Sequence, residues 1–221
     1  MLLDALGTLL ELEPPAPFLR RELAERFDVL VAEADAERAI GAEIAFYRPH
    51  LDQGRDQQSL ASLRVRCAGV LRDALPDSAR AALPAAADLV ETLLASLRFR
   101  VYADVRPALE RVRASGSRLV VVSNWDVSLH ERLRQLGLTP MLDGAVTSAE
   151  VGARKPSPAI FEQALRIAGA RASDAIHVGD SLEEDVAGAR AAGIEPLLLS
   201  RSGVAPPAGV RAIASLAELV A

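Results

Sequence analysis

Polar residues stand where several apolar segments of this chain end, and their types suit attack on an anionic substrate. Asp4 leaves the apolar start of the chain and is followed by Gly7, which permits a tight turn, and Thr8. A carboxylate in that place can attack an electrophile and form a covalent intermediate. Thr8 is expected to hydrogen-bond the nucleophile or the substrate. The residues alone leave other readings open, a turn or capping role for Asp4 and a β-branched loop role for Thr8.

Ser123 and Asn124 follow a valine-rich segment and precede an expected helix. A hydroxyl with nearby amide hydrogens can bind phosphate or carboxylate oxygens at the start of a helix, where the helix dipole favours negative charge. Asn124 or Asp126 would also serve as a helix cap. The two interpretations are compatible, because a capped helix start is itself an anion site.

Lys155 is the only lysine among the 25 basic residues, and it lies close to two prolines, Pro156 and Pro158. A lysine held there could neutralise the charge of a nucleophile and its substrate, although a solvated loop lysine is the ordinary alternative. Asp180 and Asp185 follow a further apolar segment and are hard oxygen donors suited to Mg²⁺. Ser181, three residues before Glu184, matches a capping box and is expected to be structural.

The elements that must position these residues alternate between strand and helix in the second half of the chain. Alternation of this kind predicts a mostly parallel α/β sheet covered on both faces, with ligands at the carboxyl ends of its strands. Only three residues precede Asp4, which is short for a central strand, so we expect a frayed first strand or a start further upstream. Strands are expected at 118–123, 144–148, 175–178, 196–199 and near 210–213, and helices at 105–115, 126–136, 158–168 and 182–192.

Between about Phe18 and Leu97 only helical spacing occurs, for example the apolar stripe of Leu60, Leu63 and Cys67. This segment is predicted to be a helical insertion after the first strand. We therefore expect an α/β core over residues 1–14 and 98–221, and a helical cap over residues 15–97.

Composition narrows the partners of the chain. The 221 residues carry a net charge of −5 and only 4% aromatic side chains, which argues against a nucleic-acid partner. Its apolar runs are too short for a membrane span, and no signal segment is recognised at the start. With Cys67 as the only cysteine, an internal disulfide is excluded. These features predict a cytoplasmic protein without a membrane partner. Composition does not decide the other partners, for which we expect a small-molecule substrate and a monomeric or homodimeric state.

Taken in order, the strings Asp-x-x-Gly-Thr-Leu, Ser-Asn, Lys-Pro and Gly-Asp-Ser-x-x-x-Asp resemble the four motifs of the haloacid dehalogenase-like hydrolases. The resemblance covers nearly the whole chain. It implies a Rossmann-like core with a helical (C1-type) cap. It also implies Asp4 as nucleophile, Ser123 as the binder of substrate oxygens, and Lys155 as the base that stabilises charge.

The same resemblance implies a Mg²⁺ cofactor and phosphatase-type hydrolysis of a small phosphorylated metabolite through an aspartyl intermediate. Asp4 and Asp180 would bind the metal, and Asp185 would support it or the lysine. Family phosphatases usually carry a second Asp two residues after the nucleophile, but here that position is Leu6. Leu6 cannot transfer a proton, although its backbone carbonyl could still supply the metal ligand.

Leu6 leaves two other functions open, one catalytic and one not. One is a 2-haloacid dehalogenase, since halide needs no proton to leave, but those enzymes generally lack the Gly-Asp pair and carry Tyr and Asn where this chain has Phe161 and Leu182. The other is a non-catalytic protein that binds at a retained phosphate site. A phosphonoacetaldehyde hydrolase is disfavoured, because the cap contains no lysine for a Schiff base.

In the expected cap, Arg48 and Arg55 belong to a short stretch of charged residues. Either arginine could hold a carboxylate or phosphate in the distal part of the substrate. A solvated helix end is the simpler interpretation of the same residues.

Overall fold

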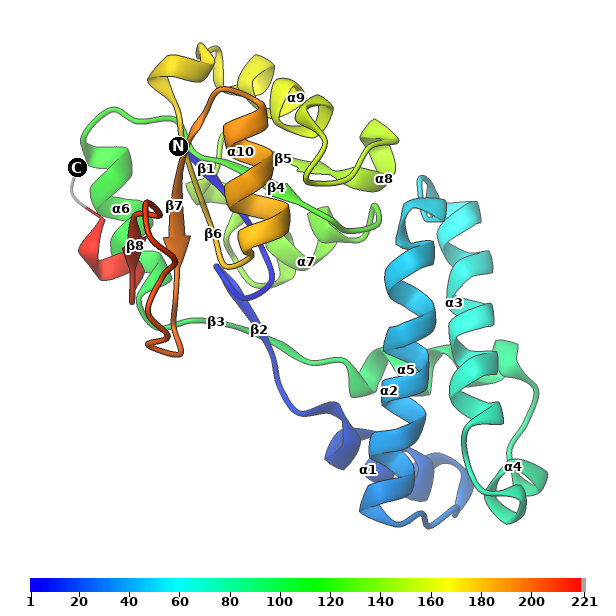
Figure 1. The fold of residues 1–221 in the computed structure, drawn as a ribbon. Helices are drawn as coiled ribbons and strands as arrows, with labels where there is room; N and C mark the ends of the chain where they lie inside the picture. The colour runs from blue at the N-terminus through cyan, green and yellow to red at the C-terminus, as the bar shows by residue number, and fades with distance from the viewer. Residues whose placement is uncertain (220–221) are drawn as a thin grey trace. The chain divides into compact units, whose positions relative to one another are not determined.

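The computed structural model describes residues 1–219 and divides into two compact units (Figure 1). Among the described residues, unit 1 contains 1–11 and 101–219, and unit 2 contains 12–100. The chain passes between them at β2 (Leu10–Leu12) and β3 (Phe99–Val101), which form a separate two-stranded sheet that the sequence reading missed. The domain boundaries expected from the sequence, 14/15 and 97/98, each lie three residues from the boundaries between the two units, 11/12 and 100/101.

Unit 1 is built on a six-stranded sheet in the order β5-β4-β1-β6-β7-β8, and all of its pairings are parallel. The predicted α/β fold with a mostly parallel sheet is therefore confirmed. Its central strands are fully buried and rich in valine and leucine, as parallel strands covered on both faces are. The strands are β1 (Leu2–Leu3), β4 (Val120–Ser123), β5 (Gly144–Thr147), β6 (Ile176–Gly179), β7 (Glu195–Leu199) and β8 (Ala212–Ile213).

The first strand is as short as the sequence suggested, yet it is central. Leu2 pairs with Val120 of β4 on one side and with His177 of β6 on the other. The amino group of Met1 donates a 2.6 Å hydrogen bond to the carbonyl of Arg118. Two paired residues are enough here, because neighbours on both sides fix the register.

Helices connect the strands of unit 1, and two of them depart from the prediction. The helix expected from Asp126 begins only at Leu129, because the Asp126 carboxylate accepts from the amide of Ser128 and shapes a turn. The helix expected over 182–192 consists of a π-helical segment, η5 (Leu182–Ala187), followed by α10 (Gly188–Ala191). The helix that begins at Leu129 is α7 (Leu129–Gln135). The other helices are α6 (Val105–Ala114), α8 (Ser148–Val151), α9 (Pro158–Ala168) and the 3₁₀ turns η3 (Thr139–Met141), η4 (Ala172–Asp174) and η6 (Leu216–Glu218).

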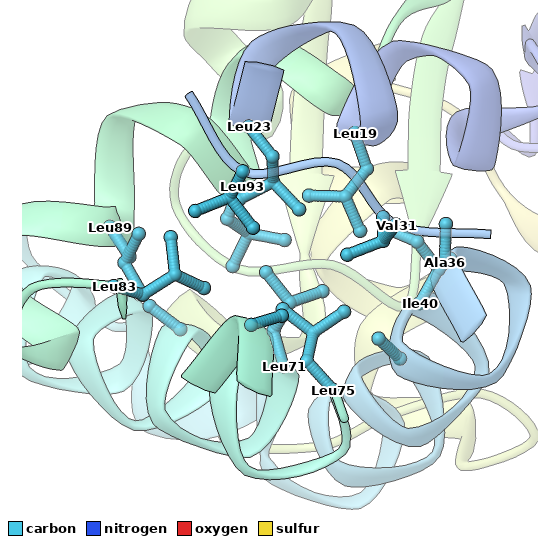
Figure 2. Packing of buried hydrophobic residues seen from close by; sticks show 14 of the residues in the cluster. Leu19, Leu23, Val31, Ala36, Ile40, Leu71, Leu75, Leu83, Leu89 and Leu93 are labelled. Atoms are coloured by element: carbon cyan, nitrogen blue, oxygen red, sulfur yellow. The ribbon is translucent and has the colours of Figure 1, made fainter. Parts of the chain in front are cut away.

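Unit 2 is helical and has its own core (Figure 2). Leu19 and Leu23 of the first helix, Leu71 of the third and Leu93 of the fifth are buried together. The predicted stripe of Leu60, Leu63 and Cys67 is buried in α3 as expected. The helices are α1 (Pro15–Phe27), α2 (Glu33–His50), α3 (Gln57–Asp73), α4 (Asp77–Ala82) and α5 (Val90–Ser96), with the 3₁₀ turns η1 (Leu51–Gln53) and η2 (Ala86–Leu89).

A search of the described residues found no helix with the length and apolar character that a membrane crossing requires.

Candidate active site

Four of the predicted residues meet at the carboxyl edge of the sheet in unit 1. Asp4 directly follows β1, Ser123 ends β4, and Asp180 directly follows β6. Because β1 lies between β4 and β6, these three positions are neighbours at one edge. Lys155 reaches the same place from the connection between α8 and α9.

Asp4 is nearly buried, with 6% of its surface exposed. Its backbone amide donates to the carbonyl of Val178, which anchors the residue to β6. Its Oδ1 accepts from Ser123 Oγ at 3.0 Å and from Lys155 Nζ at 2.6 Å. Burial raises the pKa of Asp4, and the Lys155 ammonium opposes that shift. Both of these side-chain hydrogen bonds go to the same oxygen, Oδ1.

Lys155 is buried and ion-paired with two carboxylates, so the solvated-loop alternative is wrong. Its Nζ lies 2.6 Å from both Asp4 Oδ1 and Asp185 Oδ1. Burial alone would lower the pKa of this ammonium, but the two carboxylates outweigh burial and raise it above its usual value. Lys155 is therefore a fixed positive charge at neutral pH.

Asn124, which directly follows β4, holds the backbone of Lys155. Its Oδ1 accepts from the Lys155 amide at 2.7 Å, and its Nδ2 donates to the Lys155 carbonyl at 3.1 Å. This paired contact positions the lysine chain. A direct contact between Asn124 and a substrate, which the sequence suggested, stays a prediction.

Asp185 lies behind Lys155 and is almost completely buried. One oxygen accepts from Lys155 Nζ and, at 2.8 Å, bonds to His177 Nε2, while the other accepts from the Ser181 amide at 3.0 Å. Burial would raise the pKa of Asp185, but Lys155 and His177 outweigh it and lower that pKa. A Cβ on Gly179 would lie 2.1 Å from Asp185 Cγ, so only glycine leaves room for this carboxylate.

His177 was missed as a site residue. It is fully buried in β6, its ring meets Phe161 edge-on at 4.9 Å, and its Nδ1 has no partner among the described residues. Its place in an otherwise apolar strand, three residues before Asp180, was the available signal. The same contact shows what Phe161 does in this chain, since its ring packs against the histidine that orients Asp185.

Asp180 is the exposed carboxylate of the group and lies against Gly7. Gly7 has a φ of +83°, and a Cβ there would lie 2.1 Å from Asp180 Oδ2. Partial burial and the charges of Asp4 and Asp185 raise the pKa of Asp180 to about 6. Ser181 caps the next turn by accepting from the Glu184 amide at 3.1 Å, which agrees with its predicted structural role.

The acidic residues of this site could hold a cation. Carboxylate oxygens of Asp4, Asp180 and Asp185 all lie within 4.8 Å of one another. Lys155 is paired with Asp4 and Asp185, and Asp180 adds a third carboxylate, so this excess of negative charge suits a divalent ion held by oxygen ligands. Both oxygens of Asp185 already accept hydrogen bonds, so Asp4 and Asp180 are the better placed ligands.

Two further predicted residues belong to the loop after Asp4. The side chain of Leu6 is 39% exposed, and its backbone bridges to Leu10. Thr8 is fully buried, and its Oγ1 has no hydrogen-bond partner among residues 1–219. Since buried hydroxyls are nearly always paired, this one fits a group that completes its bonding with a ligand. The roles of both residues stay predictions.

Arg48 and Arg55 lie in unit 2. Arg48 is in the last turn of α2, and Arg55 follows η1, where its Nε donates to the Asp52 carbonyl at 3.2 Å. Both side chains are exposed. Their contact with a substrate stays a prediction.

Comparison with known proteins gives a consistent picture. A family model described as haloacid dehalogenase-like hydrolase matches residues 1–193. The haloacid dehalogenase-like hydrolase domain-containing protein 3 of Mus musculus is 38% identical over 137 residues, which are 62% of this chain and 52% of that protein. The ribulose-1,5-bisphosphate 5-phosphatase of Halopiger xanaduensis is 37% identical over 100 residues, which are 45% and 42% of the two chains. This chain spans about half the length of such relatives or less.

Solved structures share the fold over nearly the whole chain. A 2-haloacid dehalogenase from Pseudomonas syringae pv. Tomato superposes with a TM-score of 0.66 and 26% identity, covering 98% of this chain and 94% of that one. A structure described as a HAD phosphatase from Thermococcus onnurineus superposes with a TM-score of 0.64 and 24% identity, covering 97% of this chain and 93% of that one. The latter likeness concerns the fold alone.

Proposed function

Because this chain belongs to the haloacid dehalogenase-like hydrolase family, we propose that it hydrolyses a small phosphorylated metabolite through an aspartyl-phosphate on Asp4. The observation that carries the proposal is the set of contacts around that carboxylate. One oxygen of Asp4 is fixed by Ser123 and Lys155, and the other is left for attack. Such an arrangement holds a nucleophile in place and compensates its charge.

In the first step, Asp4 Oδ2 forms a bond to phosphorus, and the bond from phosphorus to the leaving oxygen breaks. The leaving oxygen takes the electron pair. Water then attacks the phosphorus of the aspartyl-phosphate, which releases inorganic phosphate and restores the Asp4 carboxylate. Lys155 stabilises the negative charge on the transferring group, and the hydroxyl of Ser123 donates to one of its oxygens.

We assign Mg²⁺ to the acidic residues of the site, with Asp4, Asp180 and the carbonyl of Leu6 as its protein ligands and Asp185 in support. When bound, Mg²⁺ would neutralise charge on the phosphate and orient it. Partial burial and, after it, the charges of Asp4 and Asp185 raise the pKa of Asp180 to about 6, and such an ion would relieve the repulsion between these carboxylates.

Leu6 limits which phosphates react quickly. No proton donor stands at this position, so the leaving oxygen must depart without the help that typically contributes about 10²- to 10⁴-fold in rate. We therefore propose either slow turnover or a substrate with a stable leaving group. The names of the relatives from Halopiger and from Methanopyrus kandleri, a glyceraldehyde 3-phosphate phosphatase, support a small phosphorylated sugar as the substrate class, for which slow turnover is expected.

If the substrate is a small phosphorylated metabolite, Arg48 and Arg55 of unit 2 would bind its distal part. A monomer or homodimer in the cytoplasm, without nucleic-acid or membrane partners, stays the prediction for the protein as a whole.

Leu6 favours a second candidate, dehalogenation of a 2-haloacid, because a halide leaves without a proton. The likeness to the Pseudomonas dehalogenase agrees with that alternative. Asp180 and the non-polar residues Phe161 and Leu182 argue against it, since the family dehalogenases generally differ at all three positions.

The test is hydrolysis of an aryl phosphate by the purified protein with and without Mg²⁺, beside the variants D4N, L6D and L6N. We expect metal-dependent turnover that is lost in D4N and raised about 10²-fold or more in L6D. L6N is the matched control, because it is similar in size and polarity to L6D but cannot transfer a proton. Release of halide from 2-haloacids without phosphate release would establish the dehalogenase instead. Phosphate-analogue binding without any turnover, even in L6D, would indicate a binding protein.

A further inference from the structure

The side chain of Arg201, in the turn after β7, returns to the loop that follows Asp4. Its Nε donates to the carbonyl of Gly7 at 3.2 Å, and its Nη2 donates to the carbonyl of Thr8 at 2.8 Å. The two partners are 194 and 193 residues away in sequence. One planar guanidinium thus holds two successive carbonyls of the loop between the nucleophile and Leu9.

The guanidinium is itself fixed on its other side. Asp104 accepts from Nη1 at 2.9 Å and from Nη2 at 3.1 Å, and the Tyr102 ring lies 3.8 Å from the guanidinium carbon. Asp104 is held in turn by the hydroxyl of Ser215 at 2.7 Å and the amide of Leu216 at 2.8 Å. A bidentate contact of this kind adds geometric restraint as well as energy. Arg201 therefore has little freedom to release the loop.

Backbone hydrogen bonds within the loop close its turn, and Arg201 adds a restraint from outside on the carbonyls of Gly7 and Thr8. The Gly7 amide donates to the Leu10 carbonyl, and the amides of Leu9 and Leu10 both donate to the carbonyl of Ala5. Gly7 adopts a positive φ and lies against Asp180. A small shift of the loop would move the backbone between Asp4 and Thr8 relative to the metal ligand Asp180.

We propose that Arg201 is a positioning residue for the reaction. It fixes the carbonyls of Gly7 and Thr8 and, through them, the loop that follows Asp4, here called the Asp4 loop. This inference deepens the proposed function and rests on it. Arg201 touches neither the reacting oxygen of Asp4 nor Lys155, so its effect is on geometry and not on charge at the nucleophile. Loss of the two hydrogen bonds from Arg201 to the loop should lower kcat more than it raises KM.

The structure offers a matched control. Arg106 also donates to two successive carbonyls, Leu136 at 2.5 Å and Gly137 at 3.1 Å, and Gly137 also has a positive φ. That contact lies in the turn after α7 and not in the Asp4 loop. R106K and R201K therefore make the same chemical change at a remote loop and at the proposed site.

The experiment combines kinetics with amide hydrogen exchange on the full chain. In R201K, we expect exchange at the amides of Leu9 and Leu10 to rise about tenfold, the effect of losing one charged hydrogen bond. We expect kcat for an aryl phosphate to fall about 10- to 100-fold, with KM changed by less than about threefold. R106K should leave kcat and the exchange of residues 5–10 unchanged. Added methylguanidinium should restore part of the kcat of R201G, whereas added ammonium should not.

A purely stabilising role predicts faster exchange throughout unit 1 and no selective loss of kcat, and that result would overturn the proposal. A kcat of R201K within twofold of the natural protein would also overturn it. If R201G fails to fold, D104N loosens the same guanidinium without removing it, and it must show a smaller loss in the same direction. If the natural protein hydrolyses no phosphate, the proposed function fails, whereas the exchange measurement still decides whether Arg201 fixes the loop.

Discussion

Gly7 brings two constraints together at a single residue, a φ of +83° and the Asp180 carboxylate against its α-carbon. A Cβ at this position would lie 2.1 Å from Asp180 Oδ2. The carboxylate or the loop must then move, and both belong to the site. The absent side chain of Gly7 is therefore as necessary to the geometry as the side chains around it.

We expect G7A to lower kcat about 10²-fold, the usual consequence of displacing a reacting group by about 1 Å. G152A is the control, because Gly152 has a φ of +73° but nothing lies within 4 Å of an added Cβ. Both variants share the backbone strain, and only G7A meets the carboxylate. Equal kcat values in the two variants would contradict this interpretation.

At the level of single residues, the sequence indicated the groups that bear charge but not their supports. Asp4, Ser123, Lys155 and Asp185 are connected by hydrogen bonds, as the motifs implied. His177 and Arg201 were not predicted as site residues. A histidine in a strand and an arginine in a turn are ordinary in sequence, and only tertiary contacts distinguish them.

The helices of unit 2 form a core around α3, in which Leu71 is fully buried (Figure 2). We expect L71A to reduce the free energy of unfolding by about 2–5 kcal/mol, because it removes buried methyl groups and leaves a cavity. L30A is the control, since Leu30 is 84% exposed and such substitutions usually change stability by less than about 0.5 kcal/mol. Denaturant unfolding measures both. A loss in L30A as large as that in L71A would argue against the observed core.

Glu43 of α2 is buried with 3% exposure, and the pKa of its carboxyl is raised by burial, against a hydrogen bond from Cys67. Its folded pKa is thus above the unfolded value of 4.5, so the folded state binds more protons. Stability should fall as the pH rises from 4.5 through the folded pKa, and then level off.

We therefore expect E43Q to be more stable than the natural protein at pH 7 and to lose that advantage below pH 4.5. Thermal unfolding across this range measures the difference. D88N, at an exposed carboxyl of η2, serves as a charge-matched control. An E43Q advantage independent of pH would show that burial of the charge is not the cause.

Elements were predictable where local pattern decides them. The strands at β4 and β6 and the helices α6 and α9 follow from apolar periodicity and from their glycine and proline boundaries. The late start of α7 and the π-helical η5 were not predictable, because a side-chain turn at Asp126 and the demand for Asp185 beneath Lys155 override helical propensity. The β2–β3 pair was missed because each strand has only three residues.

For the whole molecule, an ion bound by Asp4 and Asp180 should stabilise the folded state, since ligands that bind only that state shift unfolding by mass action. At a free concentration of 100 times its Kd, Mg²⁺ should add about 2.7 kcal/mol to the free energy of unfolding. The expected result is a higher Tm with Mg²⁺ in the natural protein and no increase in D180N. Glu131→Gln, at an exposed carboxylate of α7, is the control and should keep the increase. An equal increase in D180N would place the ion elsewhere.

The position of β1 in the sheet has a consequence for biosynthesis. Its partners are residues 120–121 of β4 and 177–178 of β6, so β1 is translated well before either of its neighbours in the sheet. Unit 2 buries its own core from residues 16–93 and can become compact during that delay. Asp4 is thus translated long before its surroundings, which are completed only after β6 has emerged. A nascent chain halted before residue 176 would carry Asp4 without an active site.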